Sequence, residues 1–302
     1  MRLLFPRIGI LLLGLILSLS LGCFPSKRMT VISAGSLLEE VAKASAKQSN
    51  LRLIREGAPS YLMLMDGMIE AWPDNDRLLI AAAQAYASYA SLLLEDQDGN
   101  DPEKEAREHD AMVLYGKARK YALKSLELRG LKKPLETPLE DFKDGLKGLE
   151  KKDLPTLFWT ATCWASWISL KLDSMEALAE LPKVEALMKR SLEIDESFHY
   201  GGAHLFMGIW FASRPKGFGG DLKKAQDHFL KAIEYGQGKF LMTYVYYADY
   251  YARKATDRDL FTSTLQKVME TPEDISPELT LLNTVAKKKA KALLTRVEEY
   301  FE

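Results

Sequence analysis

The side chains best suited to bind a metal or attack a substrate are few in this sequence, and their spacing keeps them apart. Two cysteines and four histidines occur among 302 residues. His199 and His204 are five positions apart, so they do not share a helix face as a metal-binding pair four apart would. Cys163 has no histidine or basic residue beside it, which favours a buried thiol over a nucleophile. We therefore expect no metal, no cofactor and no catalytic residue, and we predict that the protein is not an enzyme.

Other patterns that carry chemistry are missing from the sequence. The acidic run at 96–101 holds Asp98 and Asn100 at calcium-loop spacing, but it lacks the glycine and the closing glutamate of an EF-hand, so we expect a polar turn. Glycine-rich phosphate loops, Gly-x-Ser-x-Gly elbows and His-Glu-x-x-His are absent. A helical lyase or hydrolase acting on cell-wall or lipid substrates would instead require carboxylates that converge in a cleft.

Aromatic side chains are the stronger candidates for binding, because they gather on a few segments. Trp159, Trp164 and Trp167 surround Cys163, and five tyrosines lie between 244 and 251. These tyrosines would wrap around one helix, so they cannot all face the core, and some are expected to face a groove or a partner. These aromatic side chains could pack in the core or line an apolar channel, and both interpretations remain open. For His204, a structural role and a ligand-lining role both remain open. The candidate ligand or partner residues are Trp159, Trp167, Tyr200, His204, Trp210, Tyr247 and Tyr251.

The first 22 residues are typical of a secretory signal peptide. Arg2 and Arg7 are the only charges before Cys23, and residues 8–21 are apolar except for two serines. As a helix these 14 residues would span about 21 Å, which is shorter than the roughly 30 Å hydrocarbon core of a bilayer. We therefore expect residues 1–22 to be removed.

Cys23 is predicted to carry lipid. Residues 19–23, Leu-Ser-Leu-Gly-Cys, resemble a bacterial lipobox, although Ser20 stands where that pattern usually has leucine. An incidental cysteine near an ordinary cleavage site is the alternative. Acyl chains such as palmitate on Cys23 would hold the protein at a membrane surface, and the sequence leaves open whether that membrane is the inner or the outer one. We thus expect a periplasmic, membrane-anchored lipoprotein.

Composition and charge describe the rest of the chain. The full sequence is 47% hydrophobic, enough for a packed core, and its formal charge is -1. Removing residues 1–22 takes away two arginines and no acid, which leaves a mature chain of charge -3 and no electrostatic reason to bind nucleic acid. No second run of 18 apolar residues follows. We divide the chain into a signal peptide (1–22), a lipidated N-terminus and spacer (23–32), and one body (33–302).

The body is predicted to be all α-helical, because hairpin signals and sustained alternation are weak. Ser36, with Glu39 three residues later, fits the capping box of a first helix. Residues 132–153 carry two prolines and two glycines and are predicted to form a crossover with a short helix. Further helices are expected at about 57–72, 76–95, 102–130, 154–172, 182–194, 199–213, 221–235, 240–254, 257–270 and 277–301.

Three of these helices share a face of small or apolar residues at positions i, i+4 and i+7. One set, Ala225, Phe229 and Ala232, matches the second helix of a tetratricopeptide repeat, in which neighbouring helical hairpins stack and bury a shared face. The others are Ala118, Ala122 and Ser125, and Val184, Met188 and Ser191. Since the sets are 66 and 41 residues apart, we predict a divergent tetratricopeptide-like array of helical hairpins with insertions; amphipathic helices that merely use alanine are the alternative.

The segment between residues 198 and 269 carries a more specific resemblance. Its ordered motifs lie at 198–208, 214–220, 225–232, 239–252 and 257–261. In this combination the chain resembles the T component of TRAP transporters (the TatT family), which are tetratricopeptide-like periplasmic lipoproteins. The resemblance implies an accessory role beside the substrate-binding P subunit of an ion-driven uptake system, with a hydrophobic or organic-acid ligand. It leaves a homo-oligomer open, and a scaffold lipoprotein for cell-envelope assembly is the alternative function.

Overall fold

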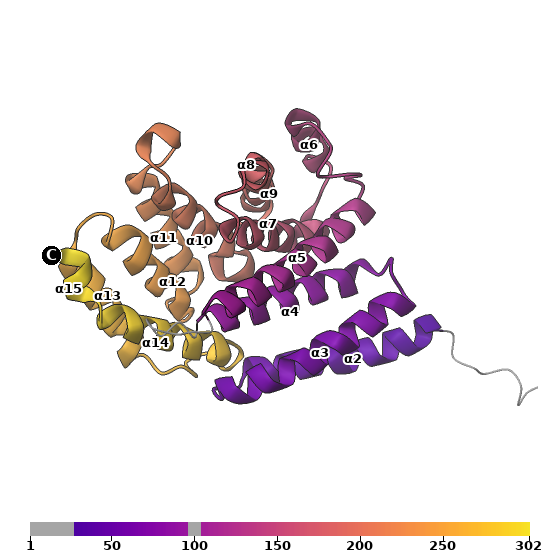
Figure 1. Ribbon diagram of the computed structural model, residues 1–302, viewed down its shortest axis with the longest axis horizontal. Helices are drawn as coiled ribbons and strands as arrows, with labels where there is room; N and C mark the ends of the chain where they lie inside the picture. The colour runs from indigo at the N-terminus through magenta and orange to yellow at the C-terminus, as the bar shows by residue number, and fades with distance from the viewer. Residues whose placement is uncertain (1–26, 96–103) are drawn as a thin grey trace, which may run out of the picture.

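The computed structural model describes residues 27–95 and 104–302, and within these ranges all regular elements are helical (Figure 1). The predicted all-α class is therefore confirmed. The predicted signal peptide, Cys23 and the turn at 96–101 lie outside the described residues. The longer helices are α2 (Lys27–Ala46), α3 (Leu51–Ala71), α4 (Asp76–Leu94), α5 (Lys104–Leu128), α7 (Leu154–Ser169), α9 (Leu181–Ile194), α10 (Phe198–Ser213), α11 (Leu222–Tyr235), α13 (Arg258–Glu270) and α14 (Thr280–Leu294).

The first helix begins earlier than the sequence suggested. Ser36 lies inside α2, where its hydroxyl donates to the Ser33 carbonyl at 2.9 Å, so the capping box predicted at Ser36 is wrong and residues 27–32 of the expected spacer are helical. The next two helices have side-chain caps of the preferred kind, because the Asn50 and Asn75 side chains accept from backbone amides at the starts of α3 and α4.

Short elements fill the connections between the long helices. The expected crossover contains α6 (Leu139–Leu146) and the turn η1 (Lys151–Asp153), and α8 (Met175–Ala179) precedes α9. Beyond α10 come η2 (Lys216–Phe218), α12 (Leu241–Tyr246), the π-helical η3 (Tyr247–Ala252), η4 (Pro277–Leu279) and α15 (Val297–Phe301).

The small-residue faces predicted from the sequence are the surfaces along which helices pair. All nine residues of the three sets are buried. Ring atoms of Phe229 on α11 come so close to Gly208 on α10 that a Cβ atom there would lie 3.0 Å from the ring. Because α4 pairs with α5, α7 with α9, and α10 with α11, the chain is an array of antiparallel helical hairpins.

The array returns on itself, so that its two ends are neighbours. Helix α14 contacts both α2 and α3, and Figure 1 shows these segments side by side at the bottom of the view. On α14, Lys289 donates to Glu95, which follows α4, at 3.1 Å, and its ammonium group lies 5.1 Å from the ring centroid of Tyr246. This partly buried ion pair links residues 194 positions apart.

Helix α4 is long and apolar enough to span a membrane by composition, the one such helix among the residues described. Half of it is buried against other helices, chiefly α5, α3 and α7. The buried core helices of folded domains can have the same length and apolar composition.

Candidate functional site

The start of α10 is a left-handed turn that brings a group of partly buried rings together. His199, Tyr200 and Gly201 have φ values of 50°, 59° and 72°. Left-handed backbone costs residues with a side chain about 1–2 kcal/mol each, so such a run persists only where packing enforces it. Strain of this kind is concentrated at functional sites.

Two glycines allow the turn to approach its neighbours. A Cβ atom on Gly201 would lie 2.9 Å from Cβ of Tyr235 and 3.1 Å from Cα of Ala232, both on α11. A Cβ atom on Gly202 would lie 2.7 Å from Cζ of Phe158 on α7. The turn is therefore clamped between α7 and α11.

The imidazole of His199 is the centre of an aromatic cluster. Its ring centroid lies 5.1 Å from that of Trp159 and 5.3 Å from that of Phe158, at distances typical of packed rings. The remaining neighbours come from the turn itself and from the residue that caps α12. They are Phe198, Tyr200 and Phe240, at 6.3, 5.7 and 6.4 Å from the His199 ring.

His199 is neutral, and its ring nitrogens bond to no other residue within the part of the chain that the structure describes. Burial lowers the pKa of His199 to about 4, so the imidazole carries no charge at neutral pH. A neutral imidazole has one donor and one acceptor nitrogen, and among the described residues neither has a hydrogen-bond partner. The cluster thus combines apolar rings with one donor and one acceptor, which is the composition of a pocket for an apolar molecule with a polar end.

His204 lies one turn further along α10, in a separate hydrogen-bonded chain. Its Nε2 is 3.2 Å from Oε2 of Glu196, and its Nδ1 is 2.9 Å from Nδ1 of His228. Because a carboxylate can only accept, a neutral His204 donates from Nε2 and accepts at Nδ1, so His228 is the donor of the second bond. Burial lowers the pKa of both histidines, that of His228 to about 4, while the hydrogen bond from His204 lowers the pKa of Glu196.

The hydrogen bonds of Glu196 with His204 and Tyr235 join α10 to α11. Tyr235 donates to the same Glu196 oxygen at 3.0 Å, and its ring stacks on His204 with centroids 5.6 Å apart. Among the described residues, no group of three or more His, Cys, Asp and Glu side chains is placed to hold a metal ion.

Two cations contact the ring of Trp167, and the neighbouring Cys163 is in the core. The Arg119 guanidinium lies 4.0 Å, and the Lys171 ammonium 4.7 Å, from the Trp167 ring centroid, a cation–π arrangement. Glu180 pairs with Arg119 at 2.6 Å. Burial raises the pKa of the Cys163 thiol to about 12, which leaves it protonated and unreactive.

The other predicted aromatic residues lie in different parts of the array. Trp210 is buried, and the Arg214 guanidinium covers its ring at 3.5 Å. On η3 the rings of Tyr247 and Tyr251 stack in parallel with centroids 5.1 Å apart, and Tyr247 also packs on Phe229.

Comparison with known proteins identifies the family. The chain matches the family described as "TRAP transporter T-component" over residues 47–301. The chain belongs to this family. A curated protein of Treponema pallidum (strain Nichols), described as an uncharacterized protein, is similar to this T component: it is 21% identical over 270 residues, which cover 87% of this chain and 84% of the other. Association with a TRAP transporter system follows from this membership.

The structure of this T component brings together two of the seven residues proposed from the sequence. Trp159 and Tyr200 belong to the His199 cluster, whereas the other five lie in the separate arrangements described above. The sequence gives no reason to single out His199, because its spacing of five positions from His204 argues against a metal pair. The adjacent Gly201-Gly202 was the available signal, because paired glycines mark a backbone that is unusual or closely approached.

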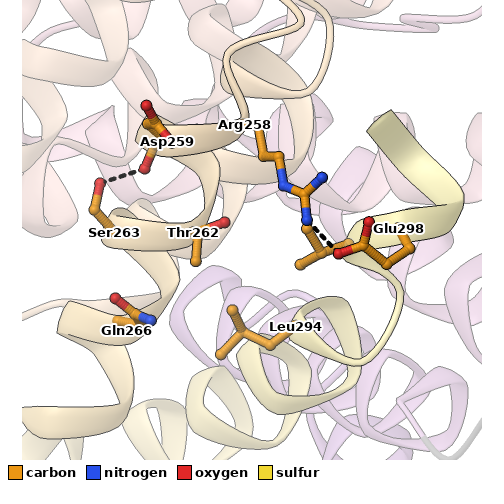
Figure 2. A pocket seen from close by; sticks show the side chains of 8 residues that line it. Arg258, Asp259, Thr262, Ser263, Gln266, Leu294 and Glu298 are labelled. Atoms are coloured by element: carbon orange, nitrogen blue, oxygen red, sulfur yellow. Dashed lines mark hydrogen bonds and ion pairs between the residues drawn. The ribbon is translucent and has the colours of Figure 1, made fainter. Parts of the chain in front are cut away.

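A hollow of this T component lies elsewhere and is lined by both polar and apolar side chains. It has a volume of about 770 Å³ and lies between α13, the end of α14 and α15. Figure 2 shows Arg258 directed toward Glu298, with which it pairs, and Ser263 bonded to the Asp259 carbonyl at 2.7 Å. Its two carboxyl groups belong to Asp259 and to Glu298, and Arg258 forms an ion pair with Glu298.

Proposed function

We propose that this T component is a lipid-anchored, non-enzymatic accessory protein that docks the substrate-binding P subunit of its TRAP system. Family membership over residues 47–301 is the observation that carries this proposal. Acylated Cys23 would hold the body at a membrane facing the periplasm, where the P subunit carries its solute. An array of stacked helical hairpins offers an extended surface for such a partner.

The T component also shares the ligand of the P subunit, which is a hydrophobic molecule or an organic acid. The His199 cluster supports this part of the proposal, because the rings suit an apolar body and the imidazole N–H suits a carboxylate. A hydrogen bond to a charged group contributes about 1.5–3 kcal/mol. A bound carboxylate would also favour the protonated imidazole and raise the pKa of His199 above its value of about 4.

Docking is tested by recovery of the membrane-anchored protein with its TRAP partners. We expect the P subunit to co-purify with this chain, and we expect uptake of the solute to fall when the chain is deleted. Recovery of envelope-assembly proteins without a P subunit, and with uptake unchanged, would favour the scaffold alternative and refute the docking proposal.

Ligand sharing is tested separately with decanoate and the alcohol of the same length. His199→Phe keeps a ring of similar size but removes both hydrogen-bonding nitrogens, so decanoate binding should weaken about tenfold or more while decanol binding changes little. His109→Phe, an exposed site on α5, is the matched control. Equal affinity of wild type and His199→Phe for decanoate would contradict the proposed role of this imidazole.

A further inference from the structure

Helix α2 exposes large apolar side chains on the face turned away from the protein. Ile32 is 61% exposed, Leu37 is 66% exposed, and Met29 nearby is 60% exposed. On the opposite face, Val31 and Leu38 are buried in a cluster with residues of α3 and α4. The helix is thus held to the body by one side and presents apolar surface on the other.

Charge is unevenly distributed along this exposed surface. Between positions 28 and 37 the helix carries Arg28 and no acid, and its first acids are Glu39 and Glu40. Arg28 lies over the ring of Trp72, 5.5 Å from its centroid, so a half-buried tryptophan stands at the same end of the hairpin. Apolar side chains with a basic residue and a tryptophan are the composition of a helix at a lipid–water interface.

The two acidic residues closest in sequence to Trp72 are Glu70, which is turned away from α2, and Asp74, which is paired with a lysine. Met68 faces α2, as shown by its contact with the Gly35 position, and Glu70 follows it by two residues, which is about 200° around α3. Asp74 is paired with Lys124 of α5 at 3.7 Å. The first three turns of α2 carry no acid of their own, and neither of these two neighbouring acids is directed at them unpaired.

The position of α2 along the chain indicates what covers this face. Cys23 precedes Lys27, the first residue of α2, by four positions, and four residues span at most about 14 Å. The family match begins at residue 47, so α2 stands between the anchor and the shared domain. A lipid tether on Cys23 would keep the first turns of α2 at the bilayer surface.

We infer that α2 is an interfacial helix, whose Ile32 and Leu37 enter the headgroup region of an anionic membrane while Arg28 faces lipid phosphates. The inference rests on the lipid anchor of the proposed function. The contact fixes the orientation of the body, because α2 packs directly on α3 and α14.

Depth of insertion is measured on the acylated protein in vesicles that contain phosphatidylglycerol. An environment-sensitive fluorophore is attached to the cysteine of Ile32→Cys or Leu37→Cys. The control is Met175→Cys, because Met175 is 74% exposed and its helix α8 lies across the array from α2 (Figure 1). Labelling is specific because Cys163 is buried and an acylated Cys23 has no thiol. We expect emission from positions 32 and 37 to shift to shorter wavelength and to be quenched by nitroxide lipids, with neither change at position 175.

The charge contribution is measured on the Cys23→Ser protein, whose residual binding to the same vesicles should weaken about fivefold in Arg28→Gln. Vesicle-bound protein whose position 32 stays in water overturns the interfacial helix and leaves the anchor intact. A wavelength shift at position 32 without nitroxide quenching also overturns it, because a second copy of the chain then covers the face. A protein that binds no vesicles lacks the anchor itself, which refutes both proposals.

Discussion

Substitution of Gly201 tests whether the left-handed turn and its clamp are real features of the fold. Gly201→Ala would add a Cβ atom at φ 72°, which costs about 1 kcal/mol in backbone strain. The same atom would meet the Tyr235 Cβ atom at 2.9 Å and the Ala232 Cα atom at 3.1 Å, and overpacking of this kind costs about 1–3 kcal/mol. The expected loss is therefore about 2–4 kcal/mol in the free energy of unfolding.

Two other glycines separate strain from overpacking. Gly219 has φ 86° but nothing near its Cβ position, so Gly219→Ala should lose only the strain of about 1 kcal/mol. Gly67 lies inside α3 with open space around it, so Gly67→Ala should stabilise the protein by about 0.5–1 kcal/mol.

The assay is urea and thermal unfolding of the Cys23→Ser protein and the three glycine variants in that background. At about 2–4 °C per kcal/mol, Gly201→Ala should lower Tm on the order of 10 °C. If Gly201→Ala and Gly219→Ala lose equal stability, α10 and α11 do not approach as closely as described, and the reasoning fails.

Three further predictions concern the anchor, the histidines and the helix pairing. Cys23→Ser should move most of the protein from the membrane to the soluble fraction on fractionation; a distribution equal to that of the wild type would exclude lipidation at Cys23. Because burial lowers the folded-state pKa of His199 to about 4, the unfolded chain binds more protons between pH 6.5 and 4, so the free energy of unfolding should fall as pH decreases through this window. His199→Asn should make that dependence shallower, and His204 and His228, whose pKa values burial also lowers, should supply the remaining slope. An unchanged slope in urea titrations would contradict the lowered pKa of His199. Phe229→Ala should lower the free energy of unfolding in urea by about 3–5 kcal/mol, because Phe229 is buried. The neighbouring Leu230 is half-exposed, so Leu230→Ala should lower it by about 0.5 kcal/mol or less. Similar losses in the two variants would refute the assigned helix face.

The helical pairing was predictable because it depends on a local period. Ala225, Phe229 and Ala232 recur at helical spacing, so any helix over this segment places them on one face, and burial of that face is the stable arrangement. The start of α2 was missed for the opposite reason. Ser36 carries a valid capping signal, yet the helix continues through it because Val31 and Leu38 bury their side chains in one cluster.

Three properties follow from local sequence alone: the helical class, the small faces along which helices pair and the absence of a local catalytic motif. Each depends on residues within a few turns of one another, where spacing fixes which side chains share a face. Two features arise only from tertiary packing. His199 lies among rings from α7 and from Phe240, the residue that caps α12, and α2 presents apolar side chains outward. These features depend on contacts between distant segments and on a left-handed backbone held by packing, and no local pattern specifies either.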